Sequence, residues 1–284
     1  NPPQPQGYDY GYGRASVLYS TDWIMQSQDL SDVNTAFSSI YNQFNTYSGT
    51  YGHLKNYKSI TTWDNLRTQI QDIEAYHSLS TIFYYGHMGL RNIGNPWPDY
   101  SYGIHVQANS ADQNPPDTIW DTDIKNYTTG DLHFVFLWVC HNGNTAGSST
   151  PSAHGAPYCW TNQILATHDT DYPYSDALHQ NYCFIGFENA SVTLMEGMGT
   201  YNGTENSYRY WLTFFYHAML NLEYTVNDAL EWASHAVNYA GGWQDQANRL
   251  YKGYNYTWWG GGGIPYAEIW GRMRIYGDGE TCLR

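Results

Sequence analysis

The stretch that decides the fold is LHFVFLWVC, residues 132–140, the most apolar run in the chain. A strand that is covered on both faces reads as a continuous apolar run, which is typical of the centre of a parallel sheet. Two further runs of this kind are TIFYYGH, residues 81–87, and YCFIGF, residues 182–187. These three runs predict the buried central strands of one sheet.

Segments with a helical repeat of apolar residues lie between and after these strands. Three of them begin after a residue that can cap a helix, at Ser31, Thr62 and Thr225. The same patterns predict strands at 15–20, 57–61 and 269–278 and a helix at 208–222. Because short apolar strands alternate with helices, the fold class is predicted to be α/β, a three-layer α/β/α sandwich with a mostly parallel central sheet of about six strands.

The remaining segments suggest one domain with an arm. Residues 1–13, NPPQPQGYDYGYG, are rich in Pro, Gly and Tyr and form an extended arm, either loosely ordered or docked on a neighbouring subunit of a homo-oligomer. Residues 14–284 are predicted to form a single domain. Within it, the stretch from Arg91 to Gly130 is rich in Asn, Pro, Asp and Gly and is expected to be a long surface loop.

Composition excludes several classes of partner. Charged residues make up only 13% of the chain, and the net charge is −14, so no basic stripe is present for nucleic acid to bind. The apolar runs are too short to cross a bilayer, so no membrane span is expected. Aromatic residues reach 18%, with 29 Tyr and 12 Trp. This excess leaves carbohydrate binding or hydrolysis as a third, weaker function class, although no pair of acids stands out for glycoside cleavage.

The expected compartment is extracellular or at the cell surface. The chain begins at Asn1 rather than Met, which fits removal of a signal peptide, and it has few Lys and a Pro-rich start. Sequons for N-glycosylation occur at four positions: Asn126, Asn189, Asn202 and Asn255. In an oxidising compartment the 4 Cys can form disulfides. Among the thiols not assigned to chemistry below, Cys159 and Cys183 are separated by the shortest loop and are the preferred pair.

The residues that carry chemistry stand at two strand ends. The run of residues 81–87 ends in Gly86-His87, and the run of residues 132–140 ends in Cys140. Carboxyl ends of parallel strands meet at one edge of a sheet, so His87 and Cys140 are expected to lie within reach of each other. An imidazole beside a thiol can accept its proton and produce a nucleophilic thiolate. The alternative is that Cys140 is an inert buried thiol.

The order of elements and four short segments resemble the caspase-like cysteine peptidases, which include caspases, legumains, clostripain and gingipains. The segment VCHNG resembles the gingipain-type Cys turn, and YKSITTWDNLRTQI resembles the strand and helix before the family His. CFIGFENAS is similar to the strand after the Cys, and RIYGD to a closing turn. The spacing of His87 and Cys140 is close to that of caspases. Among these peptidases the sequence is nearest to the gingipain, clostripain and legumain types.

The resemblance implies roles for individual residues. Cys140 is then the nucleophile and His87 the general base and acid, with oxyanion donors at the backbone N–H of Cys140 and of Met88 or Gly89. The family has Gly directly after its His, whereas this chain has Met88 there. Asp22 stands where the family places its specificity residue, with a capping Asp near the following helix as the alternative, and Glu188 is a second acidic candidate. An acid at the base of a pocket selects Arg or Lys.

The sequence therefore predicts a secreted cysteine endopeptidase that cleaves peptide or protein substrates. A preference for cleavage after basic residues is an additional expectation. The alternative is a catalytically inactive scaffold of the same fold that forms an extracellular surface or filament assembly. No cofactor is expected. The one candidate is Ca²⁺ on the acidic segment His168-Asp169-Thr170-Asp171 with Asp176, for which a solvated acidic loop is the alternative.

Overall fold

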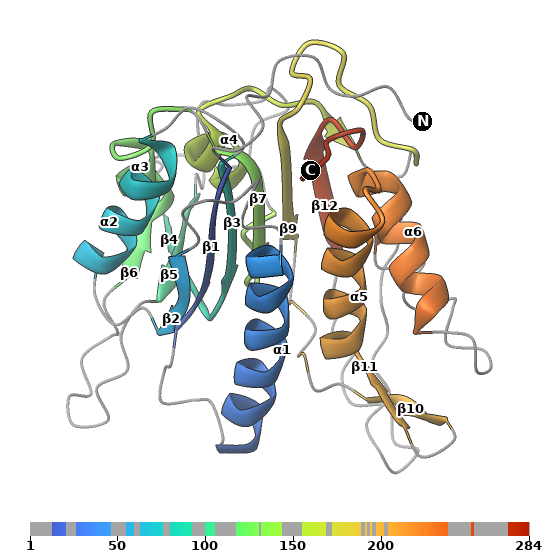
Figure 1. The fold of residues 1–284 in the computed structure, drawn as a ribbon. Coiled ribbons are helices and arrows are strands. Elements are labelled where there is room, and N and C mark those ends of the chain that lie inside the picture. The colour runs from blue at the N-terminus through green and yellow to red at the C-terminus, as the bar shows by residue number, and fades with distance from the viewer. Residues whose placement is uncertain are drawn as a thin grey trace.

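The computed structural model of the chain, drawn in Figure 1, describes residues 13–20, 27–46, 55–59, 63–75, 80–92, 100–105, 118–130, 132–143, 155–168, 172–188, 191, 194, 197–201, 204–237, 251–252 and 272–283. Residues 1–12 of the predicted arm lie outside this part of the chain.

A mainly parallel sheet forms the centre of the molecule (Figure 1). Within the described residues it has seven strands in the order β2-β1-β3-β7-β9-β12-β8. Their bounds are β1 Arg14–Tyr19, β2 Lys55–Ser59, β3 Ser80–Tyr85, β7 Leu132–Trp138, β8 Thr167–His168, β9 Cys183–Phe187 and β12 Met273–Gly277. The strands from β2 to β9 run parallel to one another, and β12 pairs antiparallel with both β9 and β8. The predicted α/β fold class is confirmed, with one more strand than expected.

Alternate residues of the central strands serve two separate cores. On β7, Phe136 and Trp138 belong to one buried apolar cluster, while Val135 and Leu137 belong to the other. Successive side chains of a strand point to opposite faces, so a continuous apolar run is required when both faces are covered. This is why the sequence of β7 lacks the polar alternation of a half-exposed strand.

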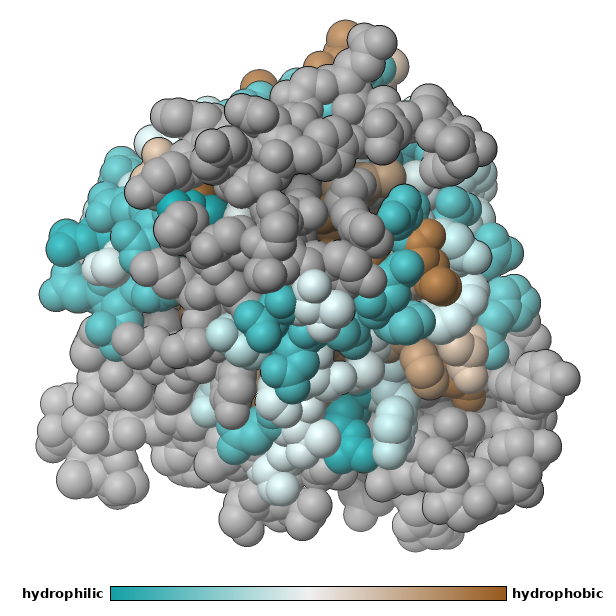
Figure 2. All heavy atoms as spheres, in the orientation of Figure 1, coloured by the Kyte–Doolittle hydropathy of each residue, from teal (hydrophilic) through white to brown (hydrophobic). Residues whose placement is uncertain are grey.

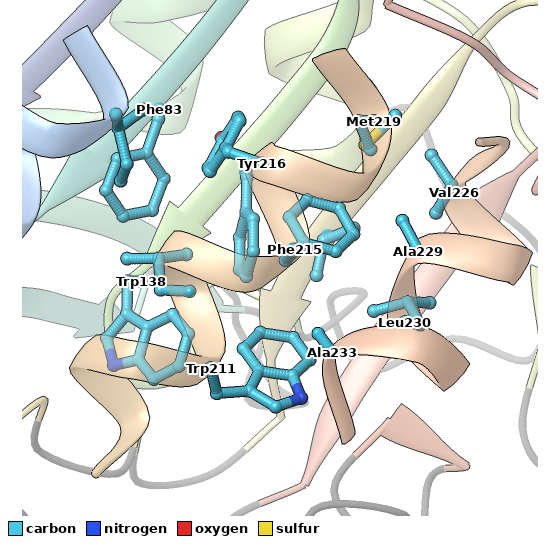
Figure 3. Packing of buried hydrophobic residues seen from close by; sticks show 14 of the residues in the cluster. Phe83, Trp138, Trp211, Phe215, Tyr216, Met219, Val226, Ala229, Leu230 and Ala233 are labelled. Carbon is cyan, nitrogen blue, oxygen red and sulfur yellow. The ribbon is translucent and has the colours of Figure 1, made fainter. Parts of the chain in front are cut away.

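Helices cover both faces of the sheet (Figure 1). One face is covered by α1 Ser27–Thr46, α5 Tyr208–Asn221 and α6 Val226–Ala236, and the other by α2 Trp63–Glu74, α3 Asp121–Lys125 and α4 Ala156–Thr161. The α5 side is strongly aromatic (Figure 3): Trp211 stacks on Phe215 with ring centroids 5.7 Å apart and lies 6.0 Å from Trp138. Full burial of an aromatic side chain of this kind contributes roughly 1.5–3 kcal/mol.

Several elements differ from the sequence prediction. Helix α1 begins at Ser27, so Ser31 lies inside it rather than at its cap, whereas Thr225 caps α6 as expected by accepting from the Asp228 N–H at 3.2 Å. The stretch predicted as one long loop, residues 91–130, contains most of an antiparallel sheet. Strand β4 Met88–Asn92 ends within this stretch, and β5 Tyr100–His105 and β6 Thr118–Trp120 lie wholly inside it. A separate antiparallel hairpin pairs β10 Gly197–Tyr201 with β11 Thr204–Ser207.

The described surface carries little exposed apolar area. On the face shown in Figure 2, apolar residues appear only in small separate areas among polar ones. Exposed large apolar side chains in the described part of the chain are Ile164, Leu178 and Leu222. Among the helices described, none combines the length and apolar character that crossing a membrane requires.

Candidate active site

The ends of β3 and β7 bring His87 and Cys140 to the same edge of the sheet. The two strands pair in parallel up to Tyr85 and Trp138, and the Gly86 N–H reaches the Trp138 carbonyl at 3.5 Å. His87 lies two residues after Tyr85, and Cys140 lies two residues after Trp138. The register therefore places both residues at the carboxyl edge of the sheet and at the same level, and their role as a pair stays a prediction. Both are half-buried.

The turn that carries Cys140 is tied to the small sheet by Asn142. The Asn142 side chain is 1% exposed, and its Nδ2 donates to the Cys140 carbonyl at 3.1 Å and to the Gly103 carbonyl on β5 at 3.4 Å. His141, between them, has a positive φ of 59°, which closes the turn. Burial lowers the pKa of His141, against a hydrogen bond to the Glu188 backbone that raises it. One buried amide thus connects the Cys140 turn to the sheet that begins directly after His87.

Gly143 joins this turn to β9. Its N–H donates to the Phe187 carbonyl at 2.8 Å, and its carbonyl accepts from the Tyr276 hydroxyl. A Cβ on Gly143 would lie 2.8 Å from the backbone of Gly186 and Phe187, and a Cβ on Gly186 would lie 2.9 Å from the Gly143 nitrogen. Two glycines are needed here because two backbones touch without room for a side chain.

Ser191 is in direct contact with the Cys140 sulfur. The Ser191 backbone N–H donates to Sγ at 3.2 Å, and the Ser191 Oγ lies 3.4 Å from the same sulfur. Sequence reasoning missed this residue. The signal that pointed to it was its place shortly after β9, whose carboxyl end lies at the same edge as those of β3 and β7.

The oxyanion candidates after His87 lie on an edge strand. The His105 N–H on β5 donates to the His87 carbonyl at 2.9 Å, so that carbonyl points to β5. The C=O and N–H groups of a trans peptide point in opposite directions, so the Met88 N–H points away from β5. Gly89 pairs with Gly103, and a Cβ on it would lie 2.4 Å from Thr118 Cγ2. Packing against β6, and not a positive φ, is therefore what requires glycine at position 89.

The Glu188 carboxylate is engaged by two arginines from the start of β12. Its Oε2 lies 3.0 Å from Arg274 Nε and 3.3 Å from Arg272 Nη1, and the Glu188 N–H donates to the Arg272 carbonyl at 2.8 Å. Burial lowers the pKa of Arg274. The Glu188 carboxylate is therefore already paired with positive charge at this corner. Asp22, the other acidic candidate, lies outside the described residues.

The predicted disulfide between Cys159 and Cys183 is wrong, because all four thiols are free. Cys183 on β9 belongs to the core on the α5 side, whereas Cys159 lies on α4, which packs against the opposite face of the sheet. Burial, with the Asp121 charge beside it, raises the pKa of Cys159 to about 12, and burial raises that of Cys183 well above 9.0. Burial and neighbouring carboxylates raise the pKa of Cys282 to about 11.

The remaining candidates are only partly described. Asn126 is exposed at the C-cap of α3, whereas Asn189, Asn202 and Asn255 lie outside the described residues. The same holds for residues 169–171 of the calcium candidate, and the carboxylate of Asp176 accepts from the Ala166 and Leu178 N–H groups. In the part of the chain that is described, no group of three or more His, Cys, Asp or Glu is arranged to hold a metal.

Comparisons with known proteins add a distant structural likeness. No family model and no curated protein matches the chain. Comparison with solved structures finds 23 similar chains, among them the Drosophila initiator caspase Dronc. That likeness has a TM-score of 0.38 and 10% identity, and it covers 82% of this chain and 75% of that one. A likeness of this size carries no argument about the site, and the fold class rests on the sheet described above.

Proposed function

We propose that this chain is a caspase-like cysteine peptidase in which Cys140 is the nucleophile and His87 the general base and acid. The observation that supports the proposal is the matched register of β3 and β7, after which positions 87 and 140 both follow at one edge of the sheet. A thiol and an imidazole so placed are the elements of a nucleophile and base pair. The free and half-buried state of Cys140 also suits a reactive thiol.

The proposed reaction has two halves. The Cys140 thiolate forms a bond to the carbonyl carbon of the scissile amide, and protonated His87 gives its proton to the leaving amine as the C–N bond breaks. Neutral His87 then takes a proton from water, whose oxygen attacks the thioester and releases the carboxylic acid. The thiol leaves as thiolate, and the pair returns to its starting state.

The negative oxygen of each tetrahedral intermediate needs donors. We assign this role to the backbone N–H groups of Cys140 and Met88. Met88 is chosen over Gly89 because its N–H points away from β5, while the Gly89 N–H lies on the β5 side of the strand. Preorganised donors at such a site typically contribute a rate factor of about a hundred to a thousand each.

We assign a preference for basic residues to Asp22. Glu188 is the weaker candidate, because its carboxylate already forms ion pairs with Arg272 and Arg274. We propose that the protein acts outside the cell or at its surface, where the exposed Asn126 is an accessible glycan acceptor. The arm of residues 1–13 is proposed to dock on a neighbouring subunit.

Selective alkylation tests the proposal. The folded protein is treated with iodoacetamide at neutral pH, and the modified thiols are identified by peptide mapping. We expect Cys140 to react at least about tenfold faster than Cys282, which is also half-buried but has carboxylates around it. Cys140→Ala should remove both the fast label and the cleavage of casein, and Cys282→Ala should remove neither.

The second candidate is a catalytically inactive scaffold. It is favoured by Met88, which replaces the glycine that the family has after its His. A folded protein whose Cys140 reacts no faster than Cys282, and which cleaves no casein, would establish the scaffold and overturn the peptidase.

A further inference from the structure

We infer that Ser191 stabilises the thiolate of Cys140 by donating two hydrogen bonds to its sulfur, one from the backbone N–H and one from the hydroxyl. The inference rests on the proposed function, since it names a residue that prepares the proposed nucleophile. Both contacts reach the same atom, at 3.2 Å from the nitrogen and 3.4 Å from the oxygen. Ser191 therefore touches the reacting atom itself.

The chemistry of the two protonation states decides the direction of the hydroxyl contact. In the neutral thiol, either Cys140 or Ser191 can be the donor across the 3.4 Å separation. A thiolate has no proton to give, so in the ionised state the Ser191 hydroxyl must donate. Hydrogen bonds to an ionised acceptor are roughly twice as strong as neutral ones. The pair of donors therefore favours the charged sulfur over the neutral one.

The described residues that precede and follow Ser191 in the chain are both anchored. On one side, Glu188 is held by its ion pairs to Arg272 and Arg274 and by its N–H bond to the β12 backbone. On the other side, Leu194 is fully buried in the core on the α5 side, and its carbonyl accepts from the Arg209 N–H at 3.0 Å. Both donors already contact the sulfur before it ionises, and preorganised donors need little reorganisation when charge develops.

The consequence for the reaction is a larger thiolate fraction near neutral pH. A thiolate whose thiol has a lower pKa is a weaker nucleophile. For each unit by which the pKa falls, the rate per thiolate falls by only about half a log unit. At a pH where most of the thiol is protonated, the gain in fraction outweighs this loss. Ser191 should therefore speed reactions of Cys140 at neutral pH and slow them by up to about threefold at high pH, where the thiol is fully ionised in either case.

The test is the pH dependence of Cys140 alkylation by iodoacetamide in Ser191→Ala, followed by peptide mapping. Removal of one donor should move the midpoint of the rate profile upward by about one pH unit and slow alkylation about threefold below it. Ser191→Thr keeps a hydroxyl and should restore the profile. Ser191→Gly, which also removes the hydroxyl, serves as a second variant if the alanine variant is poorly folded.

Two controls isolate the hydroxyl. Ser191 is also the third residue of the Asn189 sequon, so Asn189→Gln removes any glycan while keeping the hydroxyl and should leave the profile unchanged. The alkylation profile of Cys282 in the same samples reports whether the fold is intact. If Cys140 alkylates rapidly in the wild type and the Ser191→Ala profile is unchanged, the inference fails and the peptidase proposal stands. If Cys140 is unreactive in the wild type, the peptidase proposal itself fails.

Discussion

The two edges of the central sheet use their polar groups differently. At the amino edge, buried carboxylates bind loops: Glu74 accepts from the Thr128 hydroxyl and the Thr129 N–H, both just before β7. At the carboxyl edge, the hydrogen bonds of Asn142 and Ser191 converge instead on the turn and the sulfur of Cys140. The comparison suggests that one edge holds the fold together while the other is arranged around a thiol. Substitutions at the two edges should therefore affect different measurements.

Asp176 is a second buried carboxylate that binds loops at the amino edge. Burial opposes the ionisation of its carboxyl group, but the Ala166 N–H, the His179 ring and the Leu178 N–H outweigh burial and lower its pKa below 3.8. The carboxylate thus ties together the chain before β8 and the turn that leads towards β9.

The largest expected effect is a difference in activity between substitutions of two histidines at the carboxyl edge. His87→Gln should lower kcat/KM for peptide cleavage by a factor of about a hundred to ten thousand, because it removes the proposed general base and acid. His105→Gln, at the position directly across the small sheet, should lower it by less than about tenfold. The measurement is cleavage of a fluorescent peptide library. The reverse order of effects would make His105 the base.

At the amino edge, Asp176→Asn should lower the free energy of unfolding and leave kcat unchanged. A carboxyl group whose pKa is lower in the folded state stabilises the protein above its unfolded pKa, and this contribution is lost as the pH falls through the folded pKa. Urea unfolding at pH 7 should show a loss of about 2 kcal/mol. The loss should shrink as the pH falls below 3.8.

The matched control for this variant is Asp64→Asn, at an exposed ion pair with Arg67 on α2. It should change the free energy of unfolding by less than about 0.5 kcal/mol. If Asp176→Asn leaves urea unfolding unchanged but lowers kcat, the division of roles between the edges is wrong.

Asn142→Ala should affect both properties to a smaller extent. Loss of the amide that connects the Cys140 turn to β5 should lower kcat about tenfold and the free energy of unfolding by about 1 kcal/mol. Asn221→Ala removes an amide that bonds His217 on α5, away from the edge. It should cost similar stability and leave kcat unchanged, as measured by steady-state kinetics and urea unfolding. Equal kcat values for the two variants would contradict a positioning role for Asn142.

The smallest effect is expected from reducing agents. Because the four thiols are free, dithiothreitol should change the thermal midpoint by less than about 1 °C in differential scanning fluorimetry. A decrease of several degrees would show that a disulfide stabilises the folded protein.

The sequence predicted the elements whose pattern is local. The continuous apolar run of β7 was located to within a residue, and the Thr225 cap marked the start of α6, because both signals are complete within a few residues. The sheet of β4, β5 and β6 was missed. Gly89 and Gly103 pair in it beneath Thr118, and glycine is a poor strand residue whose place there depends on a close neighbour from another strand.

The same distinction applies to the candidate site. His87 and Cys140 could be found because each follows a recognisable strand, and parallel order places such residues at one edge. For Ser191 the only signal was its place shortly after a predicted strand, and for Asn142 there was none, since their contacts depend on the approach of the Cys140 turn to Ser191 and to β5. The wrong disulfide has a related cause, because loop length does not reveal which face of the sheet a thiol occupies.

The contact between Gly143 and Gly186 restricts how this chain can vary. Neither position has space for even a methyl group, so a library of substitutions should be emptied at both by selection for soluble protein. Paired variants cannot rescue each other, since a second side chain only adds to the overlap. Efforts to redesign this site should therefore leave the joint between Gly143 and Gly186 intact.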